Sequence, residues 1–269
     1  MASKKGSAKS CRVSAYTTIR DRIMSGQLLP SGRVSDFKLA RELKTSRTPV
    51  REAIKQLHGE GLLEPRKGGG YIVKRPSVED FAELLQIRRL LECFAVEQAA
   101  SRLTDEQIDQ LAEYCKVFRD TARAVRAAKL TVLDGELACR VELADASFHL
   151  LILRAAGNRR ILKVVSDLQI MTQYFGHRRY TPEWSLTTNL GIEYLQHARV
   201  ARALRKRDAV QAKRMMESMF DSGEYVMKKH AKFLEHQHGG KSPPVPDWPA
   251  ELSRRIHGLE MESEGYTRR

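Results

Sequence analysis

Proline is absent from residue 77 to residue 181, a length that can accommodate several helices. Proline disrupts a helix interior, and the apolar residues of this segment recur at intervals of three and four, which is the helical period. The same pattern resumes after Pro182 and continues to about residue 235. It predicts six helices, at residues 78–101, 104–127, 135–156, 158–175, 184–206 and 208–235.

The first 75 residues follow a different plan. Helical periodicity predicts a helix at residues 13–24, a short one at 37–43 and a third at 47–60. Extended apolar runs at residues 62–64 and 71–73 flank a basic, glycine-rich segment, which is typical of a β-hairpin. Three helices followed by a small hairpin predict a winged helix-turn-helix, which is a DNA-binding module.

We therefore predict a mainly α protein in which a winged helix-turn-helix, residues 11–75, precedes an all-α helical bundle. Residues 76–80 are predicted to be a linker and residues 81–237 to be the all-helical domain. Residues 1–10 are rich in Lys, Ser, Gly and Ala and are predicted to form a disordered basic tail. Residues 238–269 begin with a Pro/Gly-rich stretch and are predicted to be an extension outside the core.

The chain carries a formal net charge of +14, and the charge is unevenly distributed. The first 80 residues contain 17 Lys and Arg against 8 Asp and Glu, so about a third of the chain carries most of the excess. Such a field attracts a polyanion through the release of counterions. Charge alone cannot distinguish DNA from RNA or from an acidic membrane surface.

Composition argues against several other classes of protein. The four cysteines are Cys11, Cys93, Cys115 and Cys139, which form no CxxC pair, so neither a disulfide framework nor a zinc finger is indicated. No apolar run approaches the roughly 20 residues of a membrane-spanning helix, and the basic start is not followed by the apolar run of a signal peptide. We expect a cytoplasmic protein that does not associate with membranes.

The segment from Thr45 to Ala53 predicts a helix that reads DNA. Pro49 suits the first turn of a helix, which places Ser46, Arg47 and Thr48 at the N-terminus, where backbone N–H groups can also hold a phosphate. Arg51 projects one turn further along the same exposed face, and an arginine there can make a bidentate contact with guanine. Lys67, Gly68 and Gly69 at the tip of the predicted hairpin are expected to contact the DNA backbone. The alternatives are that the tip is a plain tight turn and that Arg47 and Arg51 are solvated helix charges.

Asp145 and His149 are four residues apart within a predicted helix, so both side chains lie on one face. Such a pair can hold one metal ion. The same residues can also be polar groups of a metal-free pocket, or satisfied polar groups within a core.

The run Ser46-Arg47-Thr48-Pro49-Val50-Arg51-Glu52-Ala53, with Leu57 and Gly61-Leu62 after it, resembles the signature of the GntR family of bacterial regulators. In the second domain Ile87–Glu92, Asp145–His149, Gly157-Asn158 and His197 resemble landmarks of the FadR-like subgroup, whose ligand-binding domain is called FCD. The resemblance covers about residues 12 to 235. It implies a homodimer that binds palindromic double-stranded DNA and acts as a repressor whose operator affinity depends on a metabolite, usually a carboxylate.

The resemblance also implies a metal site. The family adds to Asp145 and His149 a histidine that matches His197, and a second histidine 22 residues later, where this chain has Met219. A thioether is a poor ligand for zinc or manganese, so three of four protein ligands remain. One divalent ion (zinc, nickel or manganese) completed by water or by an effector carboxylate is one interpretation; a metal-free polar pocket is another.

Two further residues are assigned to the effector by the same resemblance. Arg88 stands where family members often direct an arginine into the cavity, and its planar cationic group suits a carboxylate. A salt bridge from Arg88 to Glu92, four residues later, is the competing interpretation. Asn158 is the second residue assigned to effector contact.

Two positions near the predicted reading helix depart from the family pattern. Lys44-Thr45 stands where the family usually has Gly-Val in the turn. Phe37 occupies a position where an arginine sometimes contacts phosphate, and the neighbouring Lys38 is expected to take over that contact. Neither difference threatens the fold, but the operator sequence cannot be inferred from relatives.

Three classes of function follow. The first is a DNA-binding transcription regulator controlled by a small molecule, which accounts for both domains. The second is a metal-dependent, hydrolase-like enzyme in which Asp145, His149 and His197 hold an ion that activates water. The third is a nucleoid-type or RNA-binding protein, which explains the charge but leaves the sensor domain without a purpose. We favour the regulator and expect no enzymatic activity, because no separate general base is evident and an enzyme has no use for a reading helix.

Overall fold

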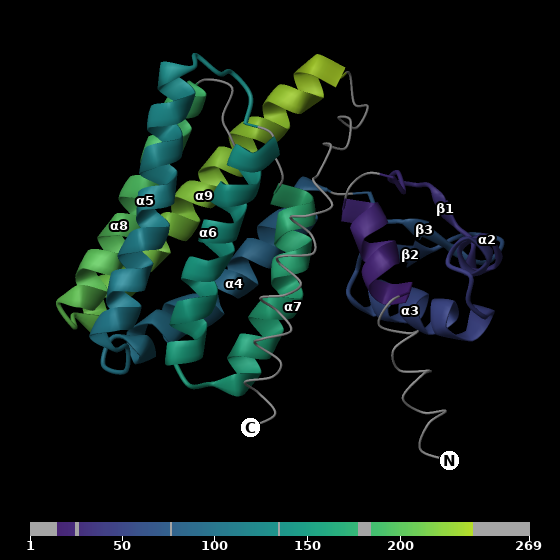
Figure 1. Cartoon of the computed structure of the whole chain (residues 1–269), viewed down its shortest axis with the longest axis horizontal. Helices are drawn as coiled ribbons and strands as arrows, with labels where there is room; N and C mark the ends of the chain where they lie inside the picture. Colours follow the sequence, from purple (N-terminus) through teal and green to yellow (C-terminus); the bar gives the residue numbers. More distant parts are fainter. Residues whose placement is uncertain (1–14, 25–26, 76, 134, 177–183, 239–269) are drawn as a thin grey trace. The chain divides into compact units, whose positions relative to one another are not determined.

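The computed structural model describes residues 15–24, 27–75, 77–133, 135–176 and 184–238. These residues form two compact units that divide between Ser77 and Val78. The tail predicted at residues 1–10 lies outside the described residues, as does the predicted extension beyond His238. The predicted mainly α fold, a small winged unit followed by a helical bundle, is confirmed (Figure 1).

The winged unit combines helices with a three-stranded antiparallel sheet. Residues 15–24 are helical, and β1 (Arg33–Val34), α2 (Asp36–Glu42), α3 (Arg47–Gly59), β2 (Leu63–Pro65) and β3 (Tyr71–Val73) follow. The sheet has the order β1-β3-β2, so the predicted hairpin of β2 and β3 is confirmed. Strand β1 was not predicted, since two residues are too short to show the alternation of a strand. It pairs with β3 through Arg33 opposite Ile72 and Val34 opposite Tyr71.

The tip of the hairpin turns on three consecutive glycines. Gly68, Gly69 and Gly70 have φ angles of 90°, 94° and 82°, a conformation that residues with a Cβ atom rarely adopt. The turn is closed by a backbone hydrogen bond from Arg66 N–H to the Gly70 carbonyl. All three glycines, Arg66 and Lys67 are exposed, so the tip presents backbone and two cations to solvent.

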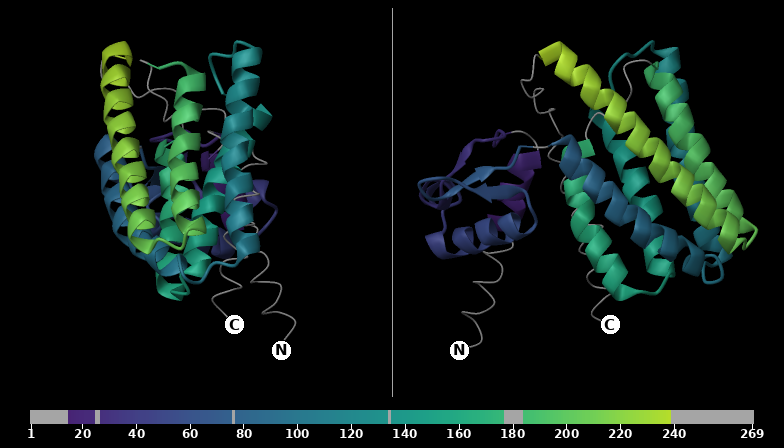
Figure 2. Two further views of the ribbon diagram at one scale, coloured as in Figure 1. Left: turned by 90° about the vertical axis from the view of Figure 1, so that its left-hand side faces the viewer. Right: turned by 180° about the vertical axis from the view of Figure 1, so that it is seen from behind.

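The second unit is a bundle of α4 (Val78–Ala99), α5 (Asp105–Ala127), α6 (Gly135–Ala155), α7 (Arg159–Gly176), α8 (Leu186–Arg205) and α9 (Ala209–His238). The six predicted helices are all present, with ends that differ by a few residues. Helix α8 packs between α5 and α9, which Figure 2 (left) shows as three neighbouring ribbons in green, teal and yellow-green. Helix α4 packs against α9 and also contacts α6 and α7.

Two apolar clusters fill the bundle. One joins α5, α6 and α8 around Phe118, Val141 and Leu190. The other joins α4, α6 and α7 around residues that include Leu150 and Val165. Helix α6 contributes to both clusters, and this central place explains why its buried residues occur on more than one face.

Three of the four cysteines lie in the described helices. Cys93, Cys115 and Cys139 are free thiols buried in the helical unit, and burial raises the pKa of Cys93 and of Cys115 to about 12. None of the helices in the described ranges is both long and apolar enough to cross a lipid bilayer.

Helix α5 begins with a reciprocal cap. The Thr104 hydroxyl accepts a hydrogen bond from the Gln107 backbone N–H, and the Gln107 side chain accepts one from the Thr104 backbone N–H. This capping box satisfies N–H groups that the helix itself leaves unpaired.

We expect Thr104→Ala to lower the free energy of unfolding by about 1 kcal/mol, because the N-cap acceptor is lost. Urea unfolding followed by far-UV circular dichroism measures the change. Thr131→Ala is the matched control, since Thr131 is exposed in the connection between α5 and α6. Equal stability of the two variants would contradict the role of the cap.

Candidate functional site

Helix α3 presents its two faces as predicted. Arg47, Thr48 and Arg51 are exposed, whereas the opposite face is buried against the winged unit through Val50, Ala53, Ile54 and Leu57. Pro49 lies within the first turn, where the missing N–H costs no intrahelical hydrogen bond. The side chain of the N-cap residue Ser46 makes no capping hydrogen bond. The exposed face of α3 therefore presents the N-terminus of the helix together with two positively charged side chains.

A single carboxylate contacts both arginines of this face. Asp36, the first residue of α2, accepts hydrogen bonds at Oδ2 from Arg47 Nη2 at 2.9 Å and from Arg51 Nε at 2.6 Å. Although partial burial raises the pKa of Asp36, hydrogen bonds from Arg51 and Arg47 hold that pKa below its usual value. Asp36 therefore remains a carboxylate at neutral pH.

The other predicted DNA contacts are also exposed. Lys38 on α2 is 72% exposed, and its Nζ lies 3.9 Å from Glu42 Oε1, a weak surface pair. Phe37 beside it is 63% exposed, a large apolar side chain in contact with solvent. Lys67, Gly68 and Gly69 occupy the exposed tip of the wing.

The helical unit contains a cavity of about 80 Å³ between α4, α6, α8 and α9. Arg88 lines it from α4, Asp145 and His149 from α6, His197 from α8 and Met219 from α9. A water-sized group occupies about 10–15 Å³ in this measure, so the cavity holds on the order of six such groups. It suits an ion with a few waters, or a small organic acid.

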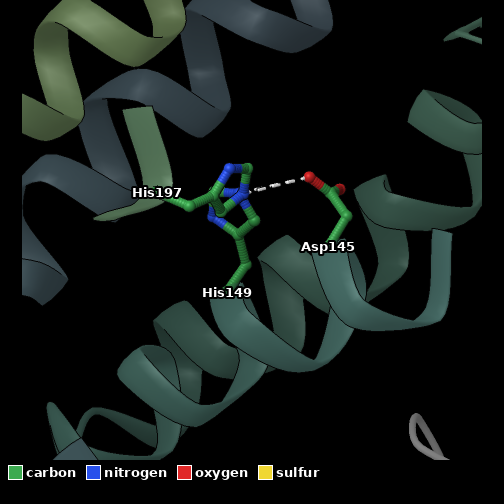
Figure 3. A group of neighbouring side chains, drawn as sticks. All are labelled: Asp145, His149 and His197. Carbon is green, nitrogen blue, oxygen red and sulfur yellow. Dashed lines mark ion pairs between the residues drawn. The ribbon is translucent and has the colours of Figure 1, made fainter. Parts of the chain in front are cut away.

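Asp145, His149 and His197 converge at this cavity (Figure 3). One potential ligand atom from each residue lies within 4.8 Å of the others. His197 Nε2 is 3.3 Å from Asp145 Oδ1, and His149 Nε2 is 3.9 Å from the same oxygen. The prediction that Asp145 and His149 share a helix face is confirmed, and the three residues form a group that could hold a metal ion.

His149 is oriented by a buried carboxylate. Its Nδ1 donates a hydrogen bond to Glu92 Oε2 at 2.5 Å, which leaves Nε2 on the side of Asp145. Glu92 Oε1 accepts a second hydrogen bond from Arg88 Nε at 2.7 Å. Burial raises the pKa of Glu92, but the charges of Arg88 and His149 and the hydrogen bonds from both outweigh it and lower the pKa to about 2. Since Glu92 is ionised, His149 must be the donor.

In His197, as in His149, one ring nitrogen donates a hydrogen bond and the other lies on the side of Asp145. Nδ1 donates to the Glu193 backbone carbonyl at 2.8 Å, one helical turn earlier. Nε2 is buried and, despite its closeness to Asp145, makes no hydrogen bond within the described part of the chain. A buried imidazole nitrogen without a partner is costly, and a metal ion would satisfy it. The donor set of two imidazoles and one carboxylate therefore fits a divalent ion.

Arg88 both forms the salt bridge with Glu92 and lines the cavity in which an effector contact was predicted. Its side chain is 3% exposed and bonded to Glu92, and it also lines the cavity, with its guanidinium carbon 5.6 Å from the centre of the Phe220 ring. The bond to Glu92 uses Nε, and the terminal nitrogens make no hydrogen bond within the described residues. They are the donors available to a ligand.

Comparison with family models identifies both units. Residues 83–222, more than half of the chain, match the FCD domain, and residues 12–73 match the bacterial regulatory proteins of the gntR family. The chain belongs to the GntR family of regulators with an FCD domain. It is a transcription regulator with a DNA-binding winged helix-turn-helix and an effector-binding domain.

Individual relatives agree with this assignment. The chain is 30% identical to the Nta operon transcriptional regulator of Aminobacter aminovorans over 52% of its own length and 60% of that protein. It is 26% identical to the transcriptional repressor NanR of Cronobacter sakazakii over 76% of its length and 78% of that protein. The solved structure of E. coli McbR/YncC shares the fold, with a TM-score of 0.62 at 18% identity, covering 81% of this chain and 97% of that one.

Lys44 has a backbone conformation that explains why the GntR family usually has glycine at this position. Its φ angle is 51°, in the left-handed region that favours glycine. The turn between α2 and α3 is nevertheless formed, with Thr45 N–H bonded to the Ala40 carbonyl at 3.0 Å. The chain therefore keeps the family turn with a residue less suited to it.

The side chain of Asn158 is exposed and caps α7. Its Oδ1 accepts hydrogen bonds from the backbone N–H groups of Arg160 and Ile161 at 3.1 Å each. Asn158 is not among the residues that line the cavity described above. Its assignment to the effector stays a prediction.

Sequence reasoning missed the part that Glu92 plays. Its i,i+4 spacing from Arg88 indicated a salt bridge, but nothing local indicated that the same carboxylate reaches His149, 57 residues later. It also missed Phe220, which lies near both Arg88 and His149. The available signal for Phe220 was its position beside Met219.

We expect Glu92→Leu to lower the free energy of unfolding by about 3–5 kcal/mol, because the Arg88 charge is left buried without its partner. Adding Arg88→Met to this variant should recover much of the loss. Asp167→Leu, which breaks an exposed pair with Lys163, is the control and should cost about 0.5 kcal/mol or less. Urea denaturation of the three variants measures these differences. A small cost for Glu92→Leu would show that the buried pair does not stabilise the FCD domain.

Proposed function

We propose that this protein is a repressor that binds a palindromic operator as a homodimer and is controlled by a small carboxylate in the FCD cavity. The observation that carries the proposal is a buried arginine, Arg88, that faces the same cavity as Asp145, His149 and His197. The repressor role is supported by the likeness to NanR, which is a repressor. The effector, by favouring one arrangement of the DNA-binding units, would alter operator affinity.

The chemistry of the cavity favours a small anion. Arg88 is held by Glu92 through Nε, and its terminal nitrogens can donate two parallel hydrogen bonds to a carboxylate. The cavity of about 80 Å³ has room for a small organic acid. The apolar ring of Phe220 beside Arg88 excludes water from this contact and strengthens it.

A metal ion is the second element of the proposed site. Asp145 Oδ1, His149 Nε2 and His197 Nε2 would hold a divalent ion such as zinc, nickel or manganese. Met219 lines the cavity where a fourth ligand stands in the family, and its thioether is a weak ligand for these ions. The ion would supply a positive charge that binds the carboxylate of an effector directly. A cavity that uses the same residues without metal is the alternative.

The homodimer is proposed because a single reading helix spans too few base pairs for useful specificity. Ile87, Leu90 and Phe94 follow one face of α4 and are 44%, 75% and 44% exposed, so the helical domain has an apolar face that could support association. The hydrolase alternative receives no support from the family models or from these relatives, which are regulators.

The reading role of α3 is tested by Arg51→Ala. We expect the variant to lose about 1–3 kcal/mol of affinity for the operator and to discriminate less well between sequences. Lys67→Ala should weaken binding to all DNA sequences alike, because a contact to phosphate carries no sequence information. Fluorescence anisotropy with operator and unrelated duplexes measures both.

The control for this comparison is Arg140→Ala, which removes an exposed arginine from α6 in the FCD domain. It should leave the ratio of the two affinities unchanged. Operator affinity of Arg51→Ala equal to that of the wild type would contradict the assignment of the reading helix.

The metal is tested by Met219→His. If the three ligands hold an ion, the wild type should lose most of it during dialysis, and Met219→His should retain close to one ion per chain, because a fourth imidazole joins the shell. Metal analysis after dialysis measures the content. Met215→His, one turn earlier on α9 and outside the cavity lining, is the matched control.

Absence of metal from both the wild type and Met219→His, together with an unchanged effector response in His149→Ala, would identify a metal-free pocket. The ligand assignment of Asp145, His149 and His197 would then be wrong, while the reading role of Arg51 would stand.

A further inference from the structure

Neither DNA reading by α3 nor effector binding explains why Asp36 contacts both exposed arginines of α3. We infer that Asp36 is a positioning residue for sequence reading, which holds Arg51 and Arg47 so that their free nitrogens face DNA bases. The inference rests on the proposed reading role of these arginines. It makes an acidic residue in a DNA-binding surface a determinant of specificity.

One carboxylate oxygen connects α2 to α3 on the reading surface. Asp36 Oδ2 accepts from Arg47 Nε at 3.2 Å and Nη2 at 2.9 Å, and from Arg51 Nε at 2.6 Å. Asp36 begins α2, and the arginines lie one turn apart at the start of α3. The carboxylate therefore fixes two side chains of the reading helix from outside that helix.

The atoms used by Asp36 leave the reading edge of Arg51 available. The bond to Asp36 uses Nε, and Nη1 and Nη2 make no hydrogen bond within the described residues. Guanine offers O6 and N7 as two adjacent acceptors, and the two terminal nitrogens of an arginine match them as parallel donors. A carboxylate on one side of the guanidinium thus orients the other side without occupying it.

The arrangement favours base contacts over phosphate contacts. Arg51 and Arg47 are 59% and 51% exposed, so without Asp36 each long side chain could turn toward any nearby phosphate. Fixing the side chain in advance reduces the conformational entropy lost on binding a base. The charge of Asp36 also repels DNA in general. Its removal should therefore have opposite effects on unspecific and specific binding, which an ordinary surface carboxylate cannot produce.

The test uses Asp36→Asn in the full chain, which keeps the shape of the side chain and removes its negative charge. One probe is a duplex selected from a random-sequence library by the wild type, and the other is an unrelated duplex of equal length. Dissociation constants for both are measured at one salt concentration. Glu64→Gln is the matched control, because it removes one negative charge from β2 in the same unit.

We expect Asp36→Asn to bind the unrelated duplex as well as the wild type or a few-fold more tightly, and the selected duplex more weakly. The dissociation constant for the unrelated duplex divided by that for the selected duplex should fall by about tenfold, which is within the range for one bidentate base contact. Glu64→Gln should lower both dissociation constants by the same factor and leave their ratio unchanged. In an Arg51→Ala background, Asp36→Asn should change the ratio much less than in the wild type.

An Asp36→Asn ratio within twofold of the wild type would overturn the inference, and so would tighter binding of the selected duplex than Glu64→Gln produces. The second result would mean that Asp36 competes with DNA for the arginines. If Arg51→Ala loses discrimination while Asp36→Asn retains it, only the role of Asp36 fails. If Arg51→Ala itself retains the ratio of the wild type, the proposed reading role fails, and the inference with it.

Discussion

The cavity of the FCD domain depends on one buried carboxylate, Glu92. Burying a charge without partners is prohibitively costly, and Glu92 is tolerated because Arg88 and His149 both donate to it. These contacts join α4 to α6 and fix two side chains that line the cavity. The same carboxylate therefore permits an arginine to be buried and sets which nitrogen of His149 faces Asp145.

The elements that the sequence predicted well are those defined by local patterns. The six helices of the bundle follow from apolar periodicity, and the start of α3 follows from Pro49 together with the polar residues before it. What could not be predicted depends on contacts between distant residues. His149 meets Glu92 across 57 positions, and β1 exists only because Arg33 and Val34 pair with β3. The cap that Asn158 forms at the start of α7 was not predicted either, because resemblance gives a position without giving the neighbours of its side chain.

The Arg88–Glu92 pair and the Arg51–Asp36 pair differ in their exposure to water, and that difference suits their roles. Arg88 and Glu92 are 3% and 1% exposed, so their attraction is little screened and the pair is a fixed part of the cavity. Arg51 and Asp36 are 59% and 23% exposed, so solvent screens their attraction. The exposed pair leaves the terminal nitrogens of Arg51 accessible to DNA, whereas the buried pair keeps its geometry when a ligand enters.

Met219 connects the proposed metal to the proposed effector. A histidine at this position would complete the protein shell around an ion, while a thioether leaves the ion short of one strong donor. A carboxylate that enters the cavity can supply that donor and can also accept from Arg88, which lines the same space. Each of the two partners would then raise the affinity of the site for the other by the same factor, because coupling between bound ligands is reciprocal. Methionine in place of histidine at position 219 would thereby make ion binding depend on the effector. With a complete shell of four protein ligands, ion binding would depend on the effector less.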